Sequence, residues 1–146
     1  MKIEIKLDKE CTEPRIIVIT DKLTEELNTA VQILNSSEPK ILLGFIDDTA
    51  EILNPEDIIR IYSECGSVYA QTERNTYKLK LRLYEAEERL NKSRFVRISN
   101  SEIVNIKRIR KFDLSLTGTI CVALSNGTVT YVSRRYMSKI KKTLGL

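Results

Sequence analysis

The stretch Thr119-Ile-Cys-Val-Ala-Leu-Ser-Asn-Gly-Thr-Val-Thr-Tyr-Val-Ser-Arg-Arg135 decides much of the fold. Its Asn126-Gly127 pair separates two runs rich in β-branched residues, and it favours a hairpin turn because both positions tolerate positive φ. The apolar residues that follow recur at helical spacing, with lysines near the end and Gly145 in place to cap a helix. The stretch therefore predicts a hairpin that leads directly into a short C-terminal helix with Ser133 as its N-cap.

The start of this predicted helix suits an anionic partner. A helix N-terminus offers unpaired backbone N–H groups and a partial positive charge, to which Arg134 and Arg135 add two guanidinium groups. Two cations at this position oppose the helix dipole, so local structure alone does not favour them. We predict that both arginines bind an anion, with a solvated helix start as the alternative.

The composition is that of a globular protein of about one domain, or one domain with a small appendage. Of the 146 residues, 42% are hydrophobic and 30% are charged. No run approaches the roughly 20 apolar residues that span a bilayer, and the first residues lack the apolar core of a signal peptide. Three widely spaced cysteines without a CxxC motif predict free thiols. Together these features predict a cytoplasmic protein.

Histidine is absent from the sequence. Without it there is no Ser-His or Cys-His pair, no imidazole metal ligand and no ordinary general base that titrates near neutrality. Nothing in the sequence assembles a carboxylate-based or lysine-based site in their place. We therefore predict no enzymatic activity, no catalytic residue, no cofactor, no metal site and no small-molecule substrate.

Charge is unevenly distributed along the chain. Residues 1–56 carry 6 Lys and Arg against 12 Asp and Glu, whereas residues 57–146 carry 18 against 8. A strongly basic second part is typical of a nucleic-acid surface, and the acidic first part requires a different role.

Residues 1–50 predict a small acidic α/β module. Lys2 to Leu7 alternate polar and apolar residues as a half-buried strand does. Asp21 is the expected N-cap of a helix whose apolar stripe we predict to be core, or else a dimer surface. That stripe consists of Leu23, Leu27, Val31 and Leu34, and residues 35–39 end the helix. The predicted strands are residues 2–7, 16–19, 41–46 and 50–53, with a turn at 47–49. The module would serve dimerisation or a regulatory partner.

Residues 51–146 predict a mainly β domain with short helices at the connections. Short runs rich in β-branched residues alternate with turn signals, which is typical of a sandwich or a rolled sheet. The predicted strands are residues 58–62, 67–72, 76–80, 95–98 and 109–115, followed by the final hairpin. The predicted helical segments are residues 55–57, 82–91 and one turn within 103–106, and Gly118 is a predicted turn.

Five short motifs in this part resemble the LytTR DNA-binding domain. They are D-I-I-R-I-Y at 57–62, E-R-L at 88–90 ending a Leu-rich helix, R-F-V-R-I-S-N-S at 94–101, I-V-N-I at 103–106 and V-S-R-R-Y at 132–136. Their order and spacing match that family over about residues 50–146. The resemblance implies an elongated, predominantly β sandwich or rolled sheet in place of a helix-turn-helix. It also implies loops at one edge that enter successive major grooves of double-stranded DNA at promoter direct repeats.

The resemblance also implies which residues contact DNA. Asn100 and Arg135 occupy the positions of two base-reading residues, and their side chains suit purine edges. Asn100 could instead be only a turn residue. A third family contact, a histidine in some members, falls near Val68 and is missing here, which leaves its replacement open. The predicted DNA backbone contacts are Arg134, Ser101, Lys78, Lys80, Lys107 and Arg108, although such cations also occur on solvated faces.

The N-terminal module is too short for a receiver domain. The chain therefore resembles stand-alone LytTR regulators, which are often encoded beside a small membrane protein. We predict a sequence-specific transcription regulator that forms a homodimer, with that membrane protein as a candidate partner. The alternative is a protein-interaction module that self-associates or docks on a membrane partner without specific DNA binding.

Overall fold

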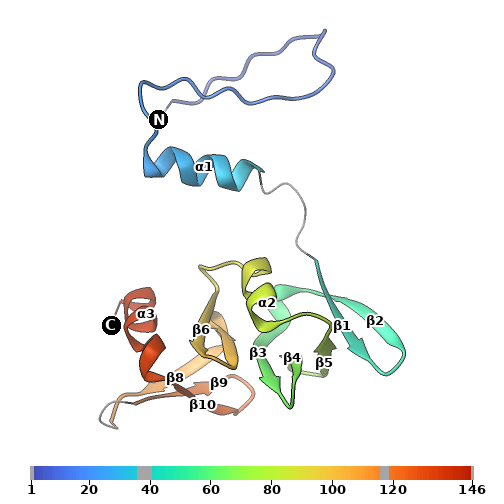
Figure 1. Ribbon diagram of the computed structural model, residues 1–146, viewed down its shortest axis with the longest axis vertical. Coiled ribbons are helices and arrows are strands. Elements are labelled where there is room, and N and C mark those ends of the chain that lie inside the picture. Colours follow the sequence, from blue (N-terminus) through green and yellow to red (C-terminus); the bar gives the residue numbers. More distant parts are fainter. Residues whose placement is uncertain (1, 36–40, 116–118, 146) are drawn as a thin grey trace. The chain divides into compact units, whose positions relative to one another are not determined.

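The computed structural model describes residues 2–35, 41–115 and 119–145 (Figure 1). Contacts divide the chain into two units, Met1–Pro39 and Lys40–Leu146. The predicted turn at Gly118 and most of the predicted helix end at 35–39 lie outside the described residues. No helix within the described ranges is long and apolar enough to cross a membrane.

Within residues 2–35, the first unit holds one helix, α1 (Glu25–Asn35), and no strand. The predicted strands at 2–7 and 16–19 are therefore wrong. Both segments have the composition of strands, but a strand is stable only when it pairs with another, and none pairs with them here. The helix begins four residues after the predicted N-cap Asp21, and the hydroxyl of Thr24 accepts a hydrogen bond from the Leu27 amide at 3.3 Å.

Most apolar residues of this unit are exposed. Leu23 is 76% exposed and Leu34 is 51% exposed, so the predicted helix stripe is not core within this unit. The two strand-like segments are exposed as well, at Ile3, Ile5, Leu7, Ile16, Ile17, Val18 and Ile19. So many exposed aliphatic side chains in one short unit favour an interaction surface over a solvated one.

The second unit consists of two antiparallel sheets, which confirms the predicted mainly β fold (Figure 1). The seven-stranded sheet has the order β2-β1-β5-β4-β3-β7-β6, and the three-stranded sheet has the order β10-β9-β8. The strands of the two sheets are β1 (Leu42–Ile46), β2 (Thr49–Leu53), β3 (Ile58–Glu64), β4 (Ser67–Thr72), β5 (Thr76–Leu79), β6 (Phe95–Ser99), β7 (Glu102–Asn105), β8 (Ile109–Asp113), β9 (Ile120–Leu124) and β10 (Val129–Val132). Its helices are α2 (Leu83–Arg89) and α3 (Arg134–Leu144), and its 3₁₀ turns are η1 (Pro55–Asp57) and η2 (Ile106–Arg108).

The C-terminal prediction is confirmed. Strands β9 and β10 pair antiparallel on either side of Asn126-Gly127, and Gly127 has φ +85°. Ser133 is the N-cap of α3, although its side chain makes no capping hydrogen bond. Gly145 ends the helix in the left-handed conformation, with φ 71°.

The predicted helical turn at 103–106 is wrong, because Glu102–Asn105 is strand β7 and the turn η2 starts at Ile106. All four residues of β7 are buried, and a strand buried on both faces has no alternation to read in its sequence. Asn105 then caps η2, and its amide nitrogen donates to the carbonyl of Ile58 at 2.8 Å.

The predicted domain boundary at residue 50 falls inside β2. Strand β1 pairs with β2 from Leu42↔Leu53 to Ile46↔Thr49, and it joins β5 through Phe45↔Lys78. Both strands therefore belong to the large sheet, and the division of contacts lies between Pro39 and Lys40.

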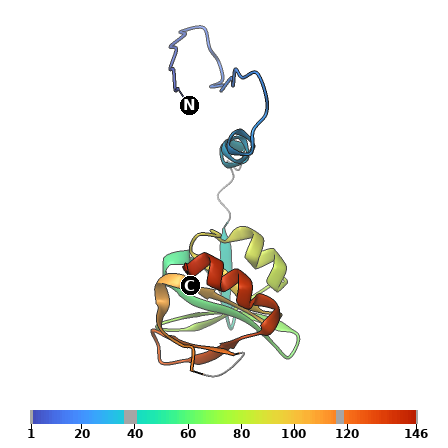
Figure 2. The ribbon, with the colours of Figure 1, turned by 90° about the vertical axis from the view of Figure 1, so that its left-hand side faces the viewer.

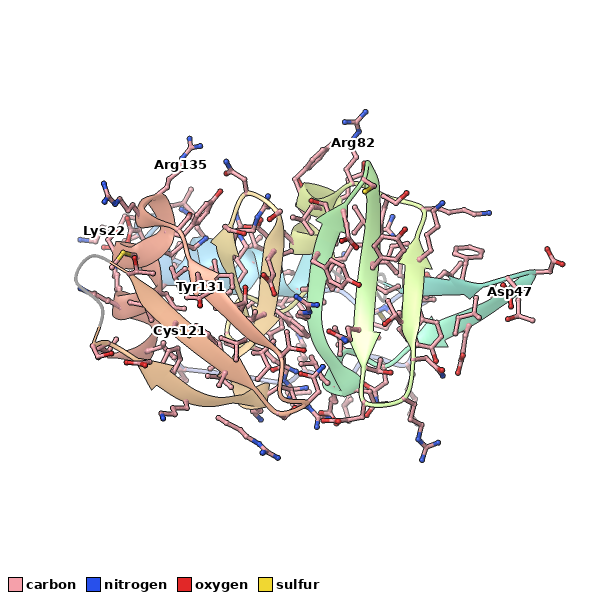
Figure 3. All side chains as sticks on the ribbon, turned by 90° about the horizontal axis from the view of Figure 1, so that it is seen from below. Lys22, Asp47, Arg82, Cys121, Tyr131 and Arg135 are labelled. Atoms are coloured by element: carbon pink, nitrogen blue, oxygen red, sulfur yellow. The ribbon has the colours of Figure 1, made fainter. Side chains whose placement is uncertain are left out.

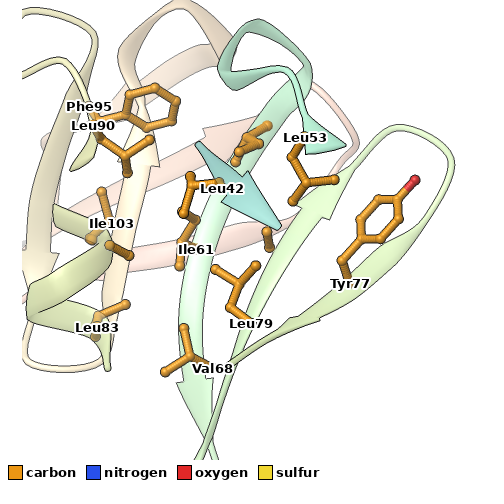
Figure 4. Packing of buried hydrophobic residues seen from close by; sticks show 13 residues of the cluster. Leu42, Leu53, Ile61, Val68, Tyr77, Leu79, Leu83, Leu90, Phe95 and Ile103 are labelled. Atoms are coloured by element: carbon orange, nitrogen blue, oxygen red, sulfur yellow. The ribbon is translucent and has the colours of Figure 1, made fainter. Parts of the chain in front are cut away.

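Two buried clusters hold the sheets together. The first lies between one face of the large sheet and α2, and includes Ile61, Leu79 and Leu83 (Figure 4). The second joins β3, β6 and β7 to the small sheet and α3, and includes Ile59 and Ile140. Figure 2 shows α2 and α3 as neighbours over the sheets, and Lys139 Nζ of α3 lies 3.9 Å from Glu87 Oε1 of α2.

Candidate nucleic-acid interface

Strand pairing determines which connections share one end of the large sheet. The pairs Glu64↔Ser67, Val68↔Leu79 and Ser99↔Glu102 place the β3–β4 turn, the residues after β5 and the β6–β7 loop at the same end. We call this the loop end. It carries Asn100 and Ser101, which are both exposed.

The start of α3 lies at the loop end as well. The Ser133 amide donates to the carbonyl of Ile98, near the end of β6, at 2.9 Å. Arg134 and Arg135 follow at once and are exposed. Figure 3 shows Arg135 and Arg82 pointing the same way from one edge of the unit. The structure thus brings together four predicted residues, and it places Arg82 at the same edge.

A single guanidinium group anchors the β6–β7 loop. Arg97 Nε donates to the carbonyl of Ser99 at 2.7 Å, and its Nη2 donates to the carbonyl of Asn100 at 2.7 Å. The third nitrogen lies 2.7 Å from Glu87 Oε2 on α2. From the other side, the Ser63 amide donates to the carbonyl of Ser101 at 2.8 Å. The loop backbone is therefore fixed although its side chains are exposed.

The side chain of Asn100 is also in contact with α3. The Tyr136 hydroxyl donates to Asn100 Oδ1 at 3.1 Å. The hydroxyls of Ser99 and Ser101 lie 3.2 Å apart. The loop and the helix that carry the two predicted base-reading residues are thus hydrogen-bonded to each other.

Lys78 lies on β5, on a face of the large sheet, and Lys80 follows the end of that strand. Lys78 pairs with Phe45 on one side and with Tyr69 on the other, and Tyr69 pairs with Tyr62. The Lys80 ammonium lies 4.3 Å from the centre of the Phe45 ring, while the two tyrosine rings stack at 5.6 Å. No spacing in the sequence indicates this row of four side chains, because it joins strands that are distant in the chain. Lys80 follows β5 directly and so lies near the loop end.

Lys107 and Arg108 lie at the opposite end of the sheet, because η2 follows the far end of β7. Arg108 Nη2 donates to the carbonyl of Glu56 at 2.9 Å, and its Nη1 lies 3.8 Å from Glu73 Oε1. The structure does not bring these two cations together with Asn100 and Arg135. Their contact with DNA stays a prediction.

The position of the missing family histidine holds a buried side chain. Val68 on β4 is 7% exposed and belongs to the first cluster. A side chain in this position packs against the core, so Val68 itself does not face a ligand. Its neighbours Ser67 and Tyr69 are half-buried on the other face.

A family model described as the LytTr DNA-binding domain matches residues 48–145. The chain belongs to the LytTR DNA-binding domain family. A solved LytTr DNA-binding domain, from a methyl-accepting/DNA response regulator of Bacillus cereus, superposes with a TM-score of 0.69 at 25% identity. The match covers 73% of this chain and 97% of that one.

Full-length relatives of this LytTR protein share its N-terminal part. An uncharacterized HTH-type transcriptional regulator of Staphylococcus aureus strain MSSA476 is 35% identical over 147 residues, which cover 100% of this chain and 99% of the relative. The corresponding regulator of strain MRSA252 matches to the same extent. Five strands separate α2 from α3, so the described residues contain no helix-turn-helix pair despite the name of these relatives.

Proposed function

We propose that this LytTR protein is a transcription regulator that binds double-stranded DNA sequence-specifically through its loop end. Asn100 and Arg135 would read base edges in the major groove, and Arg134, Ser101 and Lys80 would contact phosphates. The observation that supports this most strongly is the arrangement of the two readers: a loop and a helix start, far apart in sequence, lie at one end and are hydrogen-bonded through Tyr136.

The chemistry of these side chains fits the role. A guanidinium can bind guanine O6 and N7 with two hydrogen bonds, and a carboxamide can bind a purine edge. Among the residues that the structure describes, neither Arg134 nor Arg135 forms an ion pair, so both charges are available to DNA. The names of the Staphylococcus aureus relatives, which are transcriptional regulators, support the same conclusion.

Selection of bound sequences from a random duplex pool tests this proposal. We expect enrichment of a short element, present as a direct repeat, at both low and moderate salt. Affinity for random duplexes should fall steeply with salt, because each phosphate contact releases a counterion. Absence of any enriched element would leave a protein-interaction module as the better description.

The proposed site of action is the cytoplasm, where a bacterial promoter is accessible. We also propose that the first unit joins two copies of the chain, since two neighbouring repeats can then be bound together. Its exposed aliphatic segments and α1 stripe support this assignment. A small membrane protein as a further partner stays a prediction.

Deleting residues 2–39 is expected to lower the molar mass in solution from that of a dimer to that of a monomer. The cut falls before β1 and so leaves both sheets intact. Light scattering of the full chain and the truncated chain measures the difference. As a control, circular dichroism should show the same strand signal in both. An unchanged oligomeric state would assign self-association to the second unit.

A further inference from the structure

We propose that Tyr136 and Arg97 hold Asn100 in one orientation before DNA binds, so that its amide nitrogen Nδ2 is presented to the N7 acceptor of a purine. This inference rests on the proposed function and adds two positioning residues and a chemical preference to it. It concerns groups that need not touch the DNA themselves.

Arg97 fixes the backbone of the β6–β7 loop. The carbonyls of two consecutive residues, Ser99 and Asn100, accept from one planar guanidinium, and Glu87 holds that group from behind. The Arg97 side chain is only 13% exposed, so water competes weakly for these hydrogen bonds. These two hydrogen bonds hold the backbone on either side of the Asn100 Cα atom. The direction in which the Asn100 side chain leaves the backbone is therefore fixed before DNA binds.

Tyr136 fixes the amide at the end of that side chain. Its hydroxyl, on the first turn of α3, donates to Asn100 Oδ1 at 3.1 Å. The amide oxygen therefore faces α3, and the two N–H groups of Nδ2 remain for an outside acceptor. An asparagine with both ends free can bind adenine through N6 and N7 together, whereas one held in this way favours the N7 contact.

The hydrogen bond between Tyr136 and Asn100 also links the two proposed base-contacting residues, Asn100 and Arg135. Tyr136 follows Arg135 directly, so a displacement at the start of α3 moves Arg135 and releases Asn100 together. Tyr136→Phe removes only the hydroxyl and keeps the ring. We therefore expect this change to reorient Asn100 without unfolding the helix.

The first test needs no DNA. In nuclear magnetic resonance spectra of the full chain, the Asn100 side-chain amide pair is assigned from its disappearance in Asn100→Ala. Tyr136→Phe is expected to shift this pair, and Arg97→Lys is expected to shift the backbone amides of residues 99–101. Tyr131→Phe is the matched control, because Tyr131 is an exposed tyrosine on β10, and it should leave the pair in place. An Asn100 pair that stays unmoved in Tyr136→Phe would overturn the proposal.

The second test uses the duplex recovered by selection. Replacing one purine by its 7-deaza analogue should weaken wild-type binding about 3- to 10-fold, the effect of one hydrogen bond. The same replacement should cost Asn100→Ala nothing further, and it should cost Tyr136→Phe less than wild type. If removal of an adenine amino group, and not of N7, gives the Asn100-dependent loss, the proposed orientation is wrong.

The two tests separate failure of this inference from failure of the proposed function. If selection returns no sequence, specific DNA reading is refuted, while the spectra still decide whether Tyr136 holds Asn100. If selection succeeds and the Asn100 amide does not respond to Tyr136→Phe, the proposed regulator function is supported and the positioning role of Tyr136 is refuted.

Discussion

Asn100→Ala and Arg135→Ala are each expected to weaken binding to the selected duplex by about 1–3 kcal/mol. Both side chains lie at the loop end, and each truncation would remove the proposed hydrogen bonds to a base edge. Binding to a scrambled duplex of equal length should change much less. Fluorescence anisotropy with both duplexes at one salt concentration measures the ratio of affinities, which is the quantity that reports base reading.

Two arginines serve as controls for this result. Arg134→Ala should weaken both duplexes by a similar factor, because a phosphate contact carries no sequence information. Arg74→Ala, in the exposed β4–β5 turn at the opposite end of the sheet, should leave both affinities nearly unchanged. Equal losses on the two duplexes for Asn100→Ala and Arg135→Ala would show that these residues bind phosphates and read no base.

The largest effect on stability is expected from Ile61→Ala, at about 2–5 kcal/mol in the free energy of unfolding. Ile61 is 0% exposed and lies on β3, between β4 and β7, within the cluster of Figure 4. Truncation leaves a cavity that neighbouring strands cannot close, because hydrogen bonds on both sides hold β3 in place. Urea denaturation followed by circular dichroism gives the change.

Ile52→Ala is the matched control for this truncation. Ile52 is 68% exposed on β2, so the same loss of side chain should change stability by a few tenths of a kcal/mol at most. The slope of unfolding free energy against urea should be the same for all three proteins. A similar cost at both positions would mean that Ile61 does not lie in a packed core.

Local signals in the sequence predicted most of the second unit. Asn126-Gly127 specifies its turn through positive φ, and Gly145 ends α3 for the same reason. The strands from β3 to β6 are bounded by turn residues, so their limits could be read without knowledge of their partners. Local signals could not predict the structure of segments that depend on pairing with strands far away in the sequence. Strand β7 is buried on both faces and shows no alternation, while residues 2–7 alternate but find no strand to pair with.

The candidate site was predictable only in part. The family motifs contain Asn100 and Arg135, and strand pairing explains how the two come to lie at one end. Arg97 and Tyr136 stand within the same motifs, but their roles depend on hydrogen bonds to a loop and to α2 that no spacing reveals. Cationic composition also predicts a DNA contact for Arg108, and the structure shows that its guanidinium is positioned by the Glu56 carbonyl and the Glu73 carboxylate.

The attachment of β1 has a mechanical consequence. One register pair, Phe45↔Lys78, joins β1 to β5, whereas four pairs join β4 to β5. The chain leaves the sheet through β1 toward the first unit, so tension applied through that unit reaches the large sheet at its most sparsely bonded seam. Such tension would detach the β1–β2 hairpin from β5 before it disturbed β3. The loop end would then keep its structure while the N-terminal part was pulled.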